Sequence, residues 1–176
     1  MKITTFIDIY YNHRLQKANI VKKLYIYLII PINYFIEKIN YPKKINLDEY
    51  ANNNKKLFKK NLNFLFEYFN SDKGNKLINQ YVRFSKKNNK LIRGHKYSPY
   101  YEKFLKNLKK KKLKILEIGS FKGNATASFF FYLKNSFIYS VDLYPDLFNY
   151  KSKRIKNFKI DNSSEEELLS LSKIIK

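Results

Sequence analysis

Three carboxylic acids stand at or next to the ends of short apolar segments in the second half of the chain. Each segment is typical of a buried strand, and a turn containing Gly119 and Gly123 follows the first of them. Such a turn lets a ligand approach the backbone closely, and an acid ending the next strand can accept hydrogen bonds from both hydroxyls of a ribose. The pattern therefore predicts a pocket for a nucleoside-bearing ligand. The acids and segments are Glu117 in 113–119, Asp142 in 136–142 and Asp161 after 157–160.

The spacing within this turn distinguishes between kinds of nucleoside cofactor. A dinucleotide site uses the pattern G-x-G-x-x-G, in which the backbone approaches a pyrophosphate. Here the pattern is Glu117-x-Gly119-x-x-x-Gly123, with an acid ahead of the first glycine. A carboxylate at that position would repel a pyrophosphate, whereas it could hold an amino group. The turn therefore favours S-adenosylmethionine, whose methionine part carries an amino group, over the cofactor of a dinucleotide-dependent oxidoreductase.

Strand and helix patterns alternate around these residues. Crossovers of this kind require parallel strands, and a parallel sheet binds ligands outside the carboxyl ends of its strands. The predicted fold is α/β: the N-terminal part of a Rossmann-like, doubly wound parallel sheet, preceded by a mostly helical basic extension. The expected strands are 113–119, 136–142 and 157–160, and the expected helices are 124–133 and a segment capped by Ser163 or Ser164.

The same segments resemble a known family. ILEIGSFKGNATASF at 115–129 and IYSVDLYP at 138–145 resemble motifs I and II of class I S-adenosylmethionine-dependent methyltransferases. The resemblance covers about residues 68–170, and we can name no counterpart for residues 1–67. Further segments are similar, in the same order, to bacterial methyltransferases related to macrolide-sugar O-methyltransferases: SDKG at 71–74, HKYSPYYEKF at 95–104 and KIDNSSEEEL at 159–168.

Four residues near the first turn acquire a role from this resemblance. Gly119 and Gly123 would line the methionine part of S-adenosylmethionine, and Glu117 would order that turn or hold the amino group. Asp142 would hold the ribose. Each also has a purely local alternative: the glycines serve the turn, Glu117 caps the following helix, and Asp142 starts the turn toward Pro145.

Five further residues would surround the cofactor by the same resemblance. Asp161, with Asn162 beside it, would lie near the adenine edge. Tyr97, Tyr101 and Glu102 would cover the cofactor from the preceding helix. The local alternatives are that Asp161 is an N-cap, that the tyrosines belong to the core, and that Glu102 interacts with a helix dipole.

Three residues of the upstream segments complete the comparison. Asp72 and His95 match the family's segments, although no role follows for either, and His95 could equally be an exposed loop residue. Lys96 stands where the family usually has glycine. This departure, together with a motif I turn that is poor in glycine, is expected to weaken cofactor binding.

The activity implied by the resemblance is methyl transfer to an oxygen of a sugar or glycoconjugate, with a base to remove the hydroxyl proton. The sequence identifies no such base and no metal site, and Mg²⁺ is expected only in an intact enzyme. The 64 residues from Leu113 onward are too few for the family's complete sheet. We therefore expect a C-terminally truncated form that binds the cofactor but is inactive alone. Its partners would be a small-molecule or glycan acceptor, and either the missing half or a second copy.

The charge of the chain supports an alternative of a different class. A net charge of +22 is typical of proteins that bind anionic membranes or nucleic acids, so the alternative is a basic module on a Rossmann-like scaffold. Lys outnumbers Arg 32 to 4, which disfavours nucleic acid because base and phosphate readers prefer Arg. The absence of cysteine excludes disulfides, zinc ribbons and cysteine nucleophiles.

The chain is expected to divide into a basic helical extension (1–67), a loop and helix (68–112) and a partial Rossmann-like core (113–176). The most apolar stretch, 24–36, contains Pro31 and is short for a membrane span, so it predicts a helix that packs in a core or on a partner. Its alternatives are an interfacial anchor and a transmembrane or signal segment. Residues 47–70 are expected to form an amphipathic helix. Because no cleavage site follows 24–36, the expected location is the cytoplasm, with weak contact to the inner face of an anionic membrane.

Overall fold

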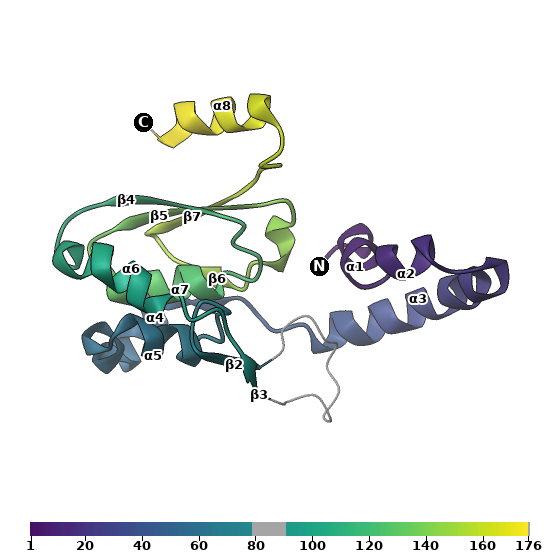
Figure 1. Cartoon of the computed structure of the whole chain (residues 1–176), viewed down its shortest axis with the longest axis horizontal. Coiled ribbons are helices and arrows are strands. Elements are labelled where there is room, and N and C mark those ends of the chain that lie inside the picture. Colours follow the sequence, from purple (N-terminus) through teal and green to yellow (C-terminus); the bar gives the residue numbers. More distant parts are fainter. Residues whose placement is uncertain (79–90, 176) are drawn as a thin grey trace. The chain divides into compact units, whose positions relative to one another are not determined.

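The computed structural model describes residues 1–78 and 91–175 (Figure 1). The chain divides into two compact units, an N-terminal unit (Met1–Lys43) and a C-terminal unit (Lys44–Lys176). This boundary differs from the one expected after residue 67. The reason is that residues between 47 and 69 supply a large part of the core of the C-terminal unit.

Helices α1 (Ile3–Tyr10), α2 (Asn12–Gln16) and α3 (Ile20–Asn40) form the N-terminal unit. Their core contains the buried side chains of Phe6, Tyr11, Ile26 and Ile30. The amide of Asn33 on α3 donates a hydrogen bond of 2.7 Å to the hydroxyl of Tyr11. The predicted helix over 24–36 is therefore confirmed as part of a core, and it continues through Pro31. In the described part of the chain, no helix is long and apolar enough to cross a membrane.

The central sheet of the C-terminal unit consists of β4 (Lys114–Ile118), β5 (Phe137–Asp142) and β7 (Ile155–Lys159). The strands are parallel, and β5 lies between the other two. Helix α7 (Asn124–Tyr132) connects β4 to β5 on one side of the sheet, and α8 (Glu165–Ile175) lies on the other side (Figure 1). The predicted α/β fold, with parallel strands and helices on both faces, is confirmed.

Strand β4 forms one edge of this sheet, and its two faces differ in exposure. Ile115 and Glu117 point to the face that α7 covers, and Glu117 is buried. Leu116 and Ile118 point to the opposite face and are 42% and 51% exposed. On that face α8 packs against the middle of the sheet through Leu171, which shares a cluster with Val141 and Ile160.

The predicted amphipathic helix over 47–70 is divided into three short helices. These are α4 (Leu47–Asn53), the 3₁₀ helix η1 (Lys55–Lys59) and α5 (Leu62–Tyr68). Asparagines stand at both breaks. Asn61 starts α5, because its side chain accepts a hydrogen bond from the N–H group of Phe64. Asn54 ends α4, and its amide donates a hydrogen bond of 3.0 Å back to the carbonyl of Tyr50.

The core of the C-terminal unit lies between α5 and α7 and is rich in aromatic rings. Phe66 of α5 meets Phe129 of α7 edge-on, with 5.6 Å between ring centroids. Phe69 stacks on Phe131 at 5.5 Å. Such ring pairs stabilise a core beyond the effect of the area that they bury. The helices that precede the sheet in the sequence therefore hold α7, and with it the turn after β4.

Two small strand pairs, which the sequence pattern did not reveal, complete the unit. Strand β1 (Ile45–Asn46) pairs in parallel with β6 (Tyr150–Lys151), and β2 (Lys76–Ile78) pairs antiparallel with β3 (Leu91–Arg93). Residues 79–90, which belong to the expected loop and helix at 68–112, lie outside the described residues. A 3₁₀ turn η4 (Pro145–Leu147) follows β5, and α6 (Ser98–Leu105) with the 3₁₀ turn η3 (Lys106–Leu108) precedes β4.

Candidate functional site

The turn between β4 and α7 is the centre of the candidate site. Gly119 and Gly123 both have left-handed backbone angles, with φ of +75° and +79°. A Cβ atom added to Gly119 would meet nothing within 4 Å, whereas one added to Gly123 would come within 2.4 Å of the ring of Phe148. Gly119 therefore leaves open space beside the turn, while Gly123 is required where Phe148 packs on the backbone.

Asp142, at the end of β5, fastens the turn to the neighbouring loop. One carboxylate oxygen accepts a hydrogen bond of 2.7 Å from the N–H group of Phe121, and the other accepts one of 2.9 Å from that of Tyr144. Each oxygen of an ionised carboxylate has a second acceptor position. The Asp142 side chain, which is half-buried, can therefore order the two loops and still accept a hydrogen bond from a ligand hydroxyl.

Backbone contacts strengthen the same connection. The N–H groups of Gly119 and Ser120 donate to the carbonyl of Val141 over 2.9 and 3.1 Å. The carboxyl ends of β4 and β5 are thus held side by side, as expected for adjacent parallel strands.

Glu117 is the buried ionisable group of this site. The hydroxyl of Thr126 on α7 donates to Oε2 of Glu117, and the ammonium of Lys73 lies 3.8 Å from Oε1. Oε1 is buried, and no hydrogen bond reaches it from the described part of the chain. Burial raises the pKa of the Glu117 carboxyl to about 7, an effect that Lys73 and Thr126 oppose and that the charges of Asp72 and Asp142 reinforce. The carboxyl can therefore gain or lose its proton near neutral pH, and a cation beside Oε1 would hold it ionised.

Lys73 reaches this carboxyl from a turn far upstream in the sequence. Residues 72–74 of this turn and residue 75 after it are bound to residues 94–97, directly after β3, by backbone hydrogen bonds of 2.7–3.1 Å. Asp72 lies 3.8 Å from the Lys73 ammonium and 3.5 Å from Nε2 of His95. The donors and acceptors of the backbone bonds are Gly94 to Asn75, His95 to Asp72, Lys96 to Gly74 and Tyr97 to Lys73.

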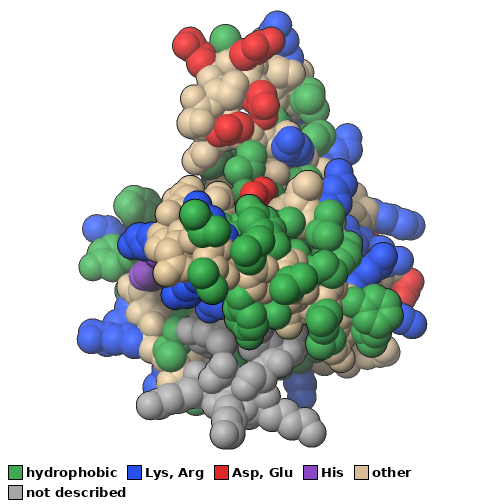
Figure 2. All heavy atoms as spheres, turned by 90° about the vertical axis from the view of Figure 1, so that its right-hand side faces the viewer, with side chains coloured by type: hydrophobic (Ala, Val, Ile, Leu, Met, Phe, Trp, Pro, Cys, Tyr) green, Lys and Arg blue, Asp and Glu red, His purple; other side chains and the backbone are tan. Residues whose placement is uncertain are grey.

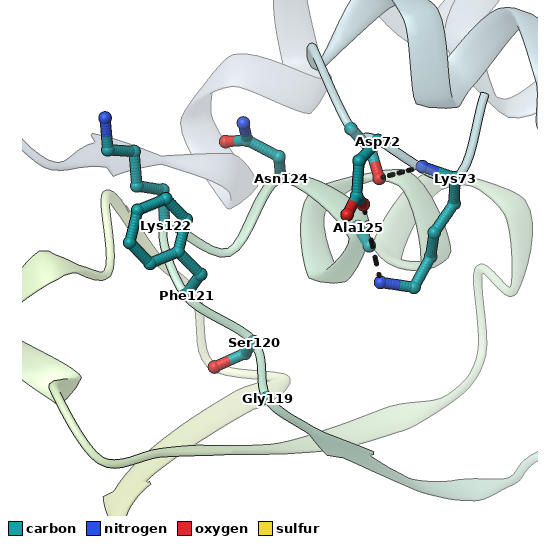
Figure 3. Close-up of a pocket in the computed structure, with 9 residues that line it drawn as sticks. Asp72, Lys73, Gly119, Ser120, Phe121, Lys122, Asn124 and Ala125 are labelled. Atoms are coloured by element: carbon teal, nitrogen blue, oxygen red, sulfur yellow. Dashed lines mark hydrogen bonds and ion pairs between the residues drawn. The ribbon is translucent and has the colours of Figure 1, made fainter. Parts of the chain in front are cut away.

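A small pocket opens where the upstream turn meets the turn after β4 (Figure 3). Its volume is about 50 Å³, far below the roughly 300–1,000 Å³ of a pocket that encloses a whole ligand. The N-cap of α7 is Gly123, so no side chain caps the first N–H groups of that helix. The pocket can thus receive one end of a ligand, and the helix dipole favours an anionic group there. Its lining residues are Ser71, Asp72, Lys73, Gly119, Ser120, Phe121, Lys122, Asn124 and Ala125.

Three predicted site residues on or before α6 do not line this pocket. The ring of Tyr101 packs in the core, with centroids 5.4 Å from Phe129. Oε1 of Glu102 accepts a hydrogen bond of 2.6 Å from the N–H group of Leu62, at the start of α5. Tyr97 is exposed and stacks on the ring of His95. Packing and helix capping account for the positions of Tyr101 and Glu102.

Asp161 and Asn162 also lie outside the pocket lining. Oδ1 of Asp161 accepts hydrogen bonds from the hydroxyl and the N–H group of Ser163, which lower the pKa of Asp161. The hydroxyl of Ser164 accepts one of 3.3 Å from the N–H group of Glu167, as the predicted cap of this helix requires. Asp161 thus orders the start of α8, and Asn162 is exposed beside it.

Sequence reasoning missed Lys73, although it lies within the SDKG segment that supported the resemblance. The available signal was a cation next to Asp72, within a segment that precedes Glu117 in the same order as the similar segments of the family. Of the predicted cofactor residues, Gly119 lines the pocket together with the upstream turn. Glu117, Gly123 and Asp142 are not part of the lining, but Glu117 lies 3.8 Å from Lys73 and Asp142 is hydrogen-bonded to Phe121, and both of those residues line it. In the described part of the chain, no group of three or more His, Cys, Asp or Glu side chains could hold a metal ion.

Lys96 has a backbone conformation that explains why glycine suits its position. Its φ of +59° lies in the left-handed region, which costs a residue with a side chain about 1–2 kcal/mol. We expect Lys96→Gly to raise the free energy of unfolding by about 0.5–1 kcal/mol, since the greater freedom of glycine in the unfolded chain offsets part of the gain. Urea denaturation measures this change. Lys103→Gly, within α6, is the control and should lower stability by about 1 kcal/mol; a loss at both positions would contradict the prediction.

No protein-family model and no curated protein matches this chain. A solved structure of the MycE methyltransferase from the mycinamycin biosynthetic pathway, in complex with Mg and SAH, is similar at 17% identity and a TM-score of 0.48, covering 66% of this chain and 27% of that one. A second structure of MycE, with Mg, SAH and mycinamycin VI, has 17% identity and a TM-score of 0.49, covering 66% and 29%. This chain therefore spans less than a third of the length of those structures.

Proposed function

We propose that the chain binds S-adenosylmethionine at the carboxyl ends of β4 and β5, as part of a class I methyltransferase. The acceptor would be an oxygen of a sugar or glycoconjugate, as the sequence resemblance implies. The observation that carries the proposal is the buried oxygen Oε1 of Glu117, which accepts no hydrogen bond from the residues that the structure describes and belongs to a carboxyl with a pKa of about 7. A buried acceptor without a hydrogen bond is costly, and an ammonium group of a ligand could donate the hydrogen bond that Lys73, at 3.8 Å, does not make.

The charges around the pocket match the two ends of a methionine group. The ammonium would approach Glu117, whereas the carboxylate would lie at the first turn of α7, within reach of the Lys73 cation. The ribose hydroxyls would donate to Asp142, whose oxygens keep acceptor positions beyond their bonds to Phe121 and Tyr144. A pyrophosphate would instead bring negative charge toward Glu117, so the same arrangement disfavours a dinucleotide.

Open space beside Gly119 would accommodate the part of the ligand between its methionine and ribose ends. A ligand of this size exceeds the pocket of about 50 Å³, so most of it would lie along the strand ends outside the pocket. We assign no base for the methyl transfer among the described residues. The test of the proposal is therefore binding rather than turnover.

Isothermal titration of the full chain with S-adenosylmethionine tests this site. Glu117→Gln and Asp142→Asn keep the shape of each side chain, and each is expected to weaken binding roughly tenfold or more, since a hydrogen bond to a charged group contributes about 1.5–3 kcal/mol. Wild-type affinity should rise roughly tenfold from about pH 6 to pH 8, because only ionised Glu117 holds the ammonium and its pKa is about 7. Glu117→Gln should lose this pH dependence.

The matched control is Glu165→Gln, which removes one exposed acid from the first turn of α8. Its affinity and pH profile should equal those of the wild type. Equal binding by all variants, or no binding by a folded wild-type chain, would refute the site. Loss of affinity in Glu117→Gln with the pH profile retained would show that Glu117 only orders the turn.

A further inference from the structure

Helix α3 of the N-terminal unit has two apolar faces, and only one of them is used inside the unit. Ile26 and Ile30 are buried in the core with Phe6 and Tyr11 of the preceding helices. The opposite face forms what we call the outer stripe, whose side chains recur at steps of three and four residues and are each at least 62% exposed. The outer stripe consists of Val21, Leu24, Leu28, Ile32, Phe35 and Ile39.

The extent of the outer stripe is unusual for a helix surrounded by water. It runs along nearly all of a 21-residue helix, which is about 30 Å long. Exposed Tyr25, Tyr27 and Ile36 widen it on both sides. A continuous apolar surface of this kind marks an interaction site, since scattered exposed apolar residues are ordinary but aligned ones are not. Hydrophobic side chains also gather on the face of the molecule drawn in Figure 2, with Lys and Arg side chains around them.

Cations lie at the margins of the outer stripe and identify the chemistry of its partner. On a helix of 3.6 residues per turn, Lys22 and Lys38 project on opposite sides of the stripe, and both are exposed. Residues 1–43 contain seven Lys and Arg against two acids. One of these acids, Glu37, is buried on the core side of α3 and only 6% exposed. The N-terminal unit as a whole is therefore basic.

We infer that α3 lies along the surface of a membrane that contains anionic phospholipid. The outer stripe inserts at the level of the head groups and upper acyl chains, and Lys22 and Lys38 extend their ammonium groups to lipid phosphates. Tyrosine rings beside the stripe suit this interface, where an apolar ring meets a polar boundary. A nucleic acid would engage the lysines but leave the outer stripe in water. In this proposal α3 lies on the membrane surface and not across it, since no helix of the described residues is both long and apolar enough to span a membrane.

Co-sedimentation of the full chain with phosphatidylcholine vesicles, with and without phosphatidylserine, tests this inference. The wild type should bind the vesicles that contain phosphatidylserine and bind more weakly at high salt. Phe35→Glu places a charge in the middle of the outer stripe and should reduce the partition coefficient at least tenfold. Lys22→Gln and Lys38→Gln should each reduce it about fivefold, and only for the anionic vesicles.

Phe104→Glu is the matched control, because Phe104 is 71% exposed on α6 and lies outside the outer stripe. It should bind vesicles like the wild type, and circular dichroism should show that both glutamate variants remain folded. A wild type that stays in the supernatant with every vesicle would overturn the inference. So would equal losses in Phe35→Glu and Phe104→Glu, or a stripe-dependent dimer that forms without lipid, which would assign the stripe to a second copy of the chain.

Discussion

Replacing Arg154 with alanine is expected to lower the free energy of unfolding by about 2–3 kcal/mol. The guanidinium lies at the end of α7, where helix carbonyls lack partners within the helix. Nη2 donates to the carbonyl of Phe130 over 3.1 Å, and Nη1 donates to those of Leu133 and Ser136 over 3.4 and 3.0 Å. The guanidinium also stacks on the Phe130 ring at 3.8 Å. Alanine would remove all of these contacts, and of the three carbonyls that of Leu133 would still accept a hydrogen bond of 3.0 Å from the N–H group of Ser136.

Urea denaturation with two companion variants tests this expectation. Arg154→Lys keeps the charge but lacks the planar fork, so it should lose about half as much stability as alanine. Lys153→Ala removes an adjacent exposed cation and should change stability by less than about 0.5 kcal/mol. If the alanine variants at 153 and 154 were equally stable, the guanidinium would not be holding the end of α7.

The stability of the wild type is expected to fall by about 3 kcal/mol between pH 4.5 and pH 7 relative to Glu117→Gln. Burial raises the pKa of Glu117 from its ordinary value of 4.5 to about 7 in the folded chain. Between these values the unfolded chain releases the proton while the folded chain retains it, so rising pH favours unfolding. Above pH 7 both states are ionised, and the folded state bears the full cost of a buried charge. Glutamine stays neutral and is free of this loss.

Denaturation at a series of pH values gives the difference between the two chains. It should be small near pH 4.5 and largest above pH 7, with Glu117→Gln the more stable chain there. Glu165→Gln is the control, because it removes an acid from an exposed position. A difference that does not change with pH would mean that Glu117 has no raised pKa. Saturating S-adenosylmethionine should reduce the difference if its ammonium pairs with Glu117.

Local sequence patterns were sufficient to predict the sheet and the helix that follows its first strand. The segments expected at 113–119 and 136–142 correspond to β4 and β5, and 124–133 corresponds to α7. Helix α7 and strand β5 are mostly buried, and β4, although its Leu116 and Ile118 are exposed, is apolar at three of its five positions, so an apolar run marks each element. Residues 47–70 were harder to interpret, because an amphipathic spacing does not show where Asn54 and Asn61 begin new helices.

The candidate site was predictable where it depends on strand ends and not where it depends on distant contacts. Glu117, Gly119 and Asp142 come together because adjacent parallel strands end at one edge of the sheet. Lys73 reaches Glu117 only because the upstream turn is bound to residues 94–97, and no local pattern reports such a contact. Tyr101 and Glu102 were assigned to the cofactor by resemblance, yet their side chains serve the core and the start of α5.

The two hydrogen bonds that Asp142 accepts from its neighbouring loops affect how fast and how tightly a ligand can bind. Because folding already fixes the backbone at Phe121 and Tyr144, the conformational entropy of these loops is spent before any ligand arrives. A ligand that binds to loops already ordered in this way loses less of its binding free energy to ordering them. Its association also requires no prior rearrangement of these loops. A modest number of polar contacts can then suffice for tight capture.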